Sequence, residues 1–238
     1  MIEVSTTASG DAGQLSINTE RLILQNGGVL FARTAGSGQA GTLNIAASES
    51  VEITGTSTTR EFASGINAEV AENATGEGGN VTIATGRLSL RDGGQIVLST
   101  LGAGDAGTLN ITADQTIQVV GASAGGNRSL ITAGVGETAT GQGGTLQLSS
   151  DRLSVREGGA ITVGTSGRGN AGGLNINTNA AVEVIGTSPN GERSSVISAG
   201  TALSATGDGG DVTISTQQFA GGGWGSNLAR YLWRRGCG

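Results

Sequence analysis

The sharpest charged motif in this chain is an arginine followed by an acidic residue and two glycines. It occurs at Arg91–Gly94 (RDGG) and again at Arg156–Gly159 (REGG). A row of guanidinium and carboxylate groups could bind a sugar or a calcium ion. The alternative is a tight turn that carries a solvated ion pair, which contributes little to stability. At the same place in an earlier segment the chain has the uncharged pair Gln25-Asn26, and this favours the turn.

Three glycine-rich strings superficially resemble phosphate-binding loops. They are Gly36–Gly41 (GSGQAG), Gly102–Gly107 (GAGDAG) and Gly167–Gly172 (GRGNAG). A phosphate loop leads from a strand into the N-terminus of a helix, but here another strand pattern follows each string. The strings also lack the tandem calcium-binding nonapeptide signature. We therefore interpret them as corners between strands.

The composition offers little other chemistry. The chain has no His, one Cys (Cys237) and 13 basic residues, all of them Arg. Polysaccharide-cleaving β-helices use clustered carboxylates, whereas acids such as Glu49 and Asp114 fall singly on different segments. The sequence therefore predicts no catalytic residue, no cofactor and no metal site. A carbohydrate-active enzyme is the lesser alternative.

The charge and hydropathy of the chain exclude several classes of partner. The net charge is −6 and the arginines form no basic stripe in the sequence, so we expect no nucleic-acid partner. No apolar run is long enough for a transmembrane helix. A charged region followed by an apolar one is also missing at the start, so the sequence predicts no signal peptide.

A long sequence repeat organises the whole chain. Gly13, Gly79, Gly144 and Gly210 mark equivalent points that recur every 65 or 66 residues, and each unit divides into a shorter and a longer half. Within each half, apolar residues alternate with polar ones and glycines punctuate the pattern. This period of two predicts strands with one buried face, and the glycines predict tight corners.

Each half-unit therefore predicts three short strands and three corners, which make one coil of a solenoid. Stacking the coils places aliphatic residues in columns, which the structure can test. One column is Leu15, Leu43, Val81, Leu109, Leu146, Leu174 and Val212, and the next is Ile17, Ile45, Ile83, Ile111, Leu148, Ile176 and Ile214. The predicted fold is an all-β, right-handed parallel β-helix of about six to seven coils, roughly 30 Å long.

These units resemble the repeats of filamentous-haemagglutinin-like exoproteins of bacterial two-partner secretion, in particular the cyanobacterial S-layer-like type. The matching segments, of the form GGxVTIxTxxLxLRDGGQI followed by AGxLNIxA, are Gly76–Ser123, Gly141–Ser188 and, less perfectly, Gly10–Ser57. The resemblance implies a secreted rod at the extracellular or outer-membrane surface. The family's N-terminal secretion domain is not recognisable. The first residues, Ile2–Val4, instead match the second strand of a longer half at Val182–Val184.

The end of the chain departs from the repeat. Aligning Val212 with Val81 places Phe219 on Leu88, but the next residues read AGGGWGSN instead of SLRDGGQI. Two interpretations stay open, an amphipathic cap helix and the out-of-frame end of a truncated gene. The cap helix would have Ser226 or Asn227 at its N-terminus and an apolar face of Trp224, Leu228, Tyr231 and Leu232. The predicted organisation is a β-helical segment 1–219, with repeats near 10–75, 76–140, 141–206 and 207–219, and an atypical tail 220–238.

The expected function is that of a non-enzymatic structural or adhesive rod segment. A gene remnant without independent function is the alternative. Three irregular segments, Thr56–Ala63, Ser123–Arg128 and Thr187–Arg193, should protrude as loops, where binding residues are often found. The expected partners are glycans or proteins of a host or cell surface, and a second copy of the chain through exposed end coils.

Overall fold

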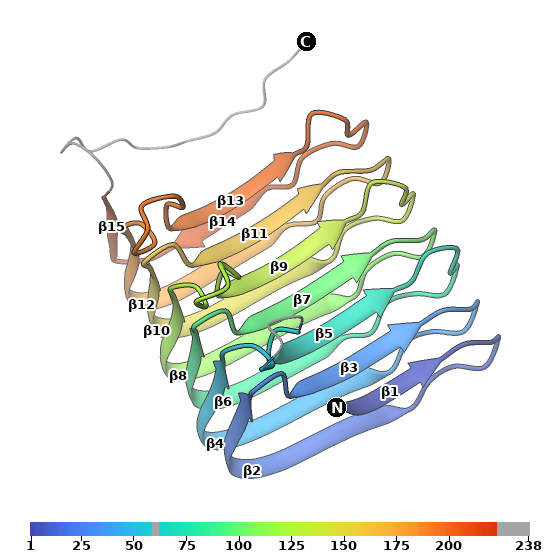
Figure 1. Cartoon of the computed structure of the whole chain (residues 1–238), viewed down its shortest axis with the longest axis horizontal. Coiled ribbons are helices and arrows are strands. Elements are labelled where there is room, and N and C mark those ends of the chain that lie inside the picture. Colours follow the sequence, from blue (N-terminus) through green and yellow to red (C-terminus); the bar gives the residue numbers. More distant parts are fainter. Residues whose placement is uncertain (59–61, 223–238) are drawn as a thin grey trace.

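Short and long strands alternate along the chain, as the glycine punctuation predicts. The computed structural model describes residues 1–58 and 62–222. All secondary-structure elements in these residues are β-strands (Figure 1). The strands form two parallel sheets that face each other across one core. This arrangement is a parallel β-helix, and the predicted fold class is confirmed.

The short-strand sheet has seven strands, each hydrogen-bonded to the equivalent strand of the next coil. In order they are β1 (Ile2–Thr6), β3 (Val29–Thr34), β5 (Gly65–Val70), β7 (Gln95–Thr100), β9 (Leu130–Val135), β11 (Ala160–Thr165) and β13 (Val196–Thr201).

The long-strand sheet lies opposite. Its strands are β2 (Gln14–Gln25), β4 (Thr42–Thr54), β6 (Val81–Arg91), β8 (Thr108–Val120), β10 (Thr145–Arg156), β12 (Leu174–Ile185) and β14 (Val212–Ser215), and β15 (Gln218–Gly222) also pairs with β12.

The long strands correct one detail of the prediction. Two of the three expected strands in each coil are a single bent strand, such as β6, whose register against β8 shifts between Thr85 and Arg87. A bulge of this kind bends a strand and leaves the pairing intact on both sides. Gly86 occupies the bend in β6, and a glycine at this point led us to predict a corner between two separate strands.

The predicted aliphatic columns are confirmed by the strand register. Leu43 pairs with Val81, Val81 with Leu109, and the same column continues through β10 and β12. All of its inner members are fully buried, whereas Leu15 and Val212 at the two ends are partly exposed. Each coil therefore buries its apolar face against the coils on either side, which is the source of stability in stacked repeats.

The corners between the short and long strands are columns of glycine. A Cβ added at Gly104 would lie closer than 3.0 Å to the carbonyl oxygen of Gly76 in the preceding coil. The same clash recurs along the stack, at Gly38, Gly76, Gly141, Gly169 and Gly207. The glycine-rich strings are thus corners, as predicted, because only glycine lets the backbones of successive coils approach this closely.

Buried threonines hold the shorter of these corners. The Thr100 hydroxyl donates a hydrogen bond to the carbonyl oxygen of Gly104 at 2.6 Å, and Thr34 and Thr165 bond in the same way to the glycine four residues on. Val70 and Val135 take the equivalent inward position in the coils whose corner is longer. In the short corners the hydroxyl therefore satisfies a buried backbone carbonyl group.

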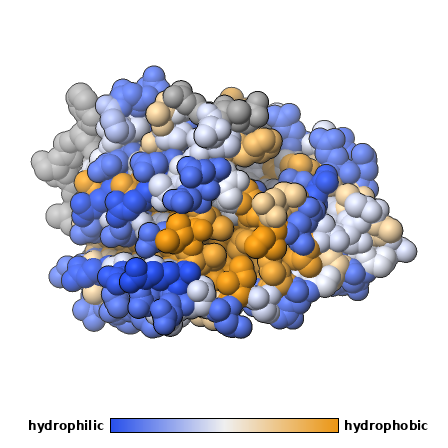
Figure 2. Space-filling view, turned by 60° about the horizontal axis from the view of Figure 1, so that its bottom comes forward, coloured by the Kyte–Doolittle hydropathy of each residue, from blue (hydrophilic) through white to orange (hydrophobic). Residues whose placement is uncertain are grey.

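The N-terminal strand lies in a different sheet from the one predicted. Ile2 pairs with Leu30 in the short-strand sheet, so the match of Ile2–Val4 to Val182–Val184 is wrong. The number of residues between the strand and the next glycine corner explains the difference. Only a short strand is followed within a few residues by such a corner, here at Gly10. This first coil leaves the core open at its end, where Figure 2 shows a hydrophobic patch. Ile2 is 52% exposed there.

At the other end of the stack, Phe219 takes the column position of Leu88, as the alignment predicts. The strand then continues through Gly222. The predicted cap helix and its residues Trp224, Leu228, Tyr231 and Leu232 lie outside the described residues.

Candidate functional site

The acidic corner residues have a structural role. Asp92 and Glu157 adopt a left-handed backbone with φ of 50° and 52°, and Asn26 at the equivalent corner has φ of 54°. Carboxylates are not needed for this conformation, which Asn and Asp adopt more readily than other side chains. The turn interpretation of these motifs therefore accounts for Asp92, Glu157 and Asn26 alike.

The predicted ion pair within each corner is wrong. Arg91 donates instead to Ser89 of its own strand at 2.9 Å and to Gln118 of the next coil at 2.6 Å. Arg156 likewise donates to Ser154, and its ion pair is with Glu183 of the next coil. Side chains two residues apart on a strand share a face, and equivalent residues of adjacent coils are neighbours. Arg91 and Asp92 are consecutive, so they neither share a face of the strand nor occupy equivalent positions of adjacent coils.

Four arginines gather on the outer surface of β6, β8 and β10. We define the arginine face as the nine outward positions after the bend of these strands. They are Arg87, Ser89, Arg91, Thr116, Gln118, Val120, Arg152, Ser154 and Arg156. The four arginine side chains are exposed, and the residues of β8 between them are half-buried.

Sequence reasoning missed the arginine face. The arginines come from segments about 65 residues apart, so no basic stripe is visible along the chain. A usable signal is present nonetheless, since Arg87–Arg91 and Arg152–Arg156 both follow the pattern Arg-x-Ser-x-Arg. In a strand this spacing places all three polar side chains on one side.

A shallow depression of about 500 Å³ overlaps the arginine face and includes five of its nine residues, and residues of β4, β6 and β8 line most of it. Arg87 and Arg91 contribute to its wall, as do Glu49 and Glu52 of β4. Glu49 forms an ion pair of 2.5 Å with Arg21, and this hydrogen bond and charge raise the pKa of Arg21. Glu52 accepts a hydrogen bond from Ser50. The depression therefore has a cationic side on β6 and an acidic side on β4.

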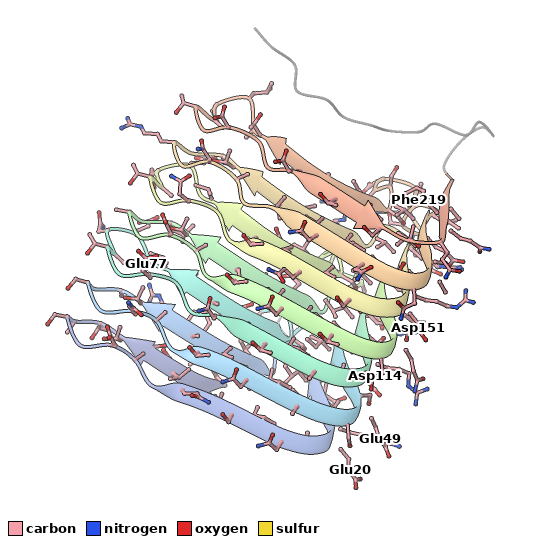
Figure 3. The ribbon with its side chains drawn as sticks, turned by 180° about the vertical axis from the view of Figure 1, so that it is seen from behind. Glu20, Glu49, Glu77, Asp114, Asp151 and Phe219 are labelled. Carbon is pink, nitrogen blue, oxygen red and sulfur yellow. The ribbon has the colours of Figure 1, made fainter. Side chains whose placement is uncertain are left out.

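Acidic residues also line the bend of the long-strand sheet. Figure 3 shows Glu20, Glu49, Asp114 and Asp151 along one edge of the stack. They fall at the register shifts of β2, β4, β8 and β10, and Gly86 takes the corresponding place in β6, so the row is interrupted between Glu49 and Asp114. They lie on a convex, exposed edge, and Asp151 accepts a hydrogen bond from Asn179 at 2.9 Å.

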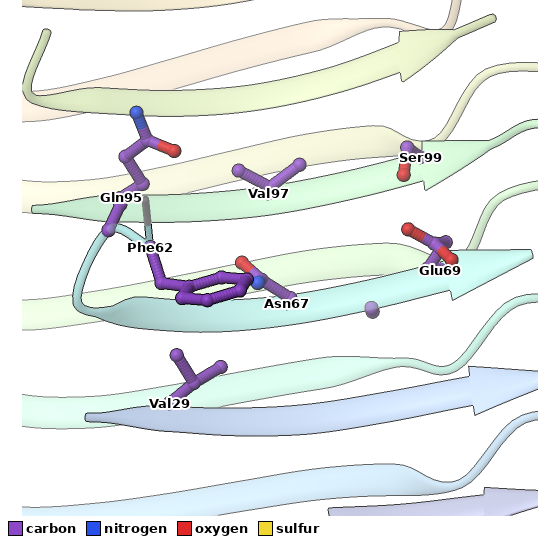
Figure 4. Close-up of a pocket in the computed structure, with 9 residues that line it drawn as sticks. Val29, Phe62, Asn67, Glu69, Gln95, Val97 and Ser99 are labelled. Carbon is purple, nitrogen blue, oxygen red and sulfur yellow. The ribbon is translucent and has the colours of Figure 1, made fainter. Parts of the chain in front are cut away.

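A second depression, of about 280 Å³, lies on the outer face of the short-strand sheet. Phe62 from the first irregular segment lies over this face next to Asn67 (Figure 4). Val29 and Val97 provide its apolar walls, and Phe62 is 65% exposed. Glu69 at its edge is bound by Arg33 at 3.0 Å.

The second irregular segment fastens coils to each other. Arg128 donates to the carbonyl oxygens of Gly158 and Ser194, both at 2.7 Å, and to that of Gly159 at 3.2 Å. Burial lowers the pKa of Arg128, and the nearby charge of Arg193 lowers it further. This predicted loop residue therefore connects successive coils, and its guanidinium is already occupied by backbone carbonyl groups.

The described residues contain no group of three or more His, Cys, Asp or Glu side chains arranged to hold a metal ion. No helix that could cross a membrane is found in residues 1–58 and 62–222.

Comparison of the chain with protein-family models, curated protein sequences and solved structures found no match. The resemblance to filamentous-haemagglutinin-like exoproteins therefore rests on the repeat residues alone.

Proposed function

We propose that this chain is a non-enzymatic, structural and adhesive rod segment of a bacterial secreted or cell-surface exoprotein. The observation that carries the proposal is the uninterrupted stack of coils (Figure 1). Columns of glycine form its corners. Such a stack holds outward side chains at fixed spacings over a long surface, which is what an adhesive rod requires.

The distribution of charged groups supports binding over catalysis. Glu49 and Glu52 share a depression, but it is open, and Arg21 already holds Glu49 in an ion pair. General acid–base catalysis needs a proton donor and an acceptor placed on either side of a substrate bond. A carbohydrate-active enzyme therefore remains the weaker proposal. The gene-remnant alternative depends on the tail, which lies outside the described residues.

A bead assay tests the adhesive function with the full chain. The protein is coupled to beads through its single cysteine, Cys237, and the beads flow over a layer of bacterial cells. We expect the cells to retain more of the protein-coated beads than of control beads whose coupling groups are capped with free cysteine. Equal retention of the two kinds of bead would contradict the proposal.

The same protein is incubated with acidic and neutral polysaccharides while reducing ends are measured. We expect no increase over the buffer control. A sustained increase that tracks the purified chain would support the enzyme alternative instead.

A further inference from the structure

We propose that the arginine face binds an anionic polysaccharide, a sugar chain that carries carboxylate or sulfate groups at regular intervals. This inference rests on the proposed function, because it names the ligand class of the adhesive surface. It differs from the sequence-based expectation, in which no basic surface was foreseen.

The four guanidinium groups form a regular array. Arg87 and Arg91 are four residues apart on β6, which corresponds to about 13 Å along an extended strand. Arg152 and Arg156 repeat this pair on β10, two coils away, at about 10 Å across the sheet. The strand register aligns Arg87 with Arg152 and Arg91 with Arg156 through the residues of β8 between them. A polymer with repeated negative charges can therefore contact several arginines at once, and simultaneous contacts raise affinity strongly.

Three of the four arginines form no ion pair in the described part of the chain. Among the described residues, no hydrogen bond or ion pair holds the guanidinium groups of Arg87 and Arg152. The partners of Arg91, Ser89 and Gln118, are neutral. Only Arg156 has a carboxylate partner, Glu183. Arginine forks bind carboxylate and sulfate-like groups in two-point contacts.

The sheet surface between the arginines has polar groups that can bind a sugar chain. Ser89, Ser154 and Thr116 present hydroxyl groups and Gln118 an amide, all half-buried on a flat sheet surface. These groups can donate to and accept from sugar hydroxyls. The nine positions of the arginine face include no aromatic side chain, whereas proteins that bind single-stranded nucleic acid stack bases on aromatic rings in addition to contacting the phosphates. The face therefore favours a polysaccharide over a nucleic acid.

Acidic residues limit the site and set its salt dependence. Asp114 and Asp151 lie at the bend, Asp92 and Glu157 at the corner, and Glu49 and Glu52 lie on the coil before β6. The anionic chain is thus confined to the strip of β6, β8 and β10. Because the whole protein is also negative, at −6, attraction is short-ranged and salt should weaken it readily.

The test measures binding of the full chain to immobilised polymers by biolayer interferometry. The probes are polygalacturonate for carboxylate, dextran sulfate for sulfate, unmodified dextran as the neutral control, and single-stranded DNA. The test variant is R87Q/R152Q. Its matched control is R33Q/R168Q, which removes the same charge elsewhere, because Arg33 lies on the short-strand sheet and Arg168 in a corner. Far-UV circular dichroism confirms that each variant is folded.

We expect binding to at least one acidic polysaccharide and none to dextran, and R87Q/R152Q should weaken it roughly tenfold. The control variant should bind like the wild type, and R87K/R152K should restore part of the affinity. The stronger of the two acidic probes identifies the anionic group. The inference is overturned if neither acidic polysaccharide binds, if the control variant loses as much affinity, or if DNA binds better. Retention of the beads on cells in that case would leave the adhesive function standing without this ligand.

Discussion

The glycine columns lead to the most demanding prediction, for the substitution Gly104→Ala. The new Cβ would lie closer than 3.0 Å to both the carbonyl carbon and the oxygen of Gly76. These are backbone atoms of the preceding coil, so no side-chain rotation can relieve the clash. Gly141 of the following coil packs on Gly104 in the same way, so the corner is confined from both sides.

The expected cost of Gly104→Ala follows from these contacts. Separating the two coils at this corner endangers two backbone hydrogen bonds to the Ala74 carbonyl oxygen, from the N–H of Ala103 at 2.8 Å and from that of residue 104 at 3.3 Å. Overpacking and the loss of one or two buried hydrogen bonds together predict a destabilisation of about 3 to 5 kcal/mol.

Gly134→Ala is the matched control. Gly134 lies on the outer face of β9, with no heavy atom within 4 Å of an added Cβ, and its φ is outside the left-handed region. Alanine there restricts the unfolded chain without strain, so stability should stay equal or rise by up to about 1 kcal/mol.

Urea unfolding of the full chain, followed by far-UV circular dichroism, measures both variants against the wild type. The reasoning is refuted if Gly104→Ala lies within about 0.5 kcal/mol of the wild type, the range of an ordinary surface substitution. It is refuted equally if Gly134→Ala costs as much as Gly104→Ala, since steric contact would then not distinguish the two glycines.

Three further predictions concern other contacts of the stack. Thr100→Val should cost about 1 to 2 kcal/mol, because the buried carbonyl of Gly104 loses its donor, and Thr100→Ser should retain most of the stability in the same urea assay. Arg128→Ala should cost about 1 to 2 kcal/mol, since three carbonyl groups lose a partly exposed donor; a thermal melt unchanged from wild type would show that this residue does not fasten the coils. Ile2→Lys should reduce concentration-dependent association in sedimentation velocity, because it places a charge at the open end of the core. Ile185→Lys, on the side of the stack, should leave association unchanged, and an equal effect of both would argue against contact through the end coil.

Much of the fold could be predicted because its signals are local and repeated. The alternation around Val81 and Ile83 identifies a half-buried strand, and the recurrence of the same pattern aligns these residues with Leu109 and Ile111. In a stack of like coils, sequence equivalence is spatial adjacency. The core columns therefore followed from the repeat, and so did the corners built on glycine.

The charged surface could not be predicted in the same way. Whether Arg91 pairs with Asp92 or with Gln118 depends on side-chain direction and on the neighbouring coil. In the structure Arg91 donates to Gln118. The N-terminal Ile2–Val4 was misplaced because three alternating residues fit two different columns equally well.

By itself, the sequence determined that this chain builds a coil stack with an aliphatic core, since a period of two and glycine punctuation leave few other ways to bury Val, Ile and Leu. Only the tertiary structure decided what the outside presents. It aligned Arg87 with Arg152 and placed Glu49 beside Arg21, because parallel coils bring residues far apart in sequence within one or two strand spacings of each other. Charges that are scattered along the chain thus become an ordered array on the β-helix surface.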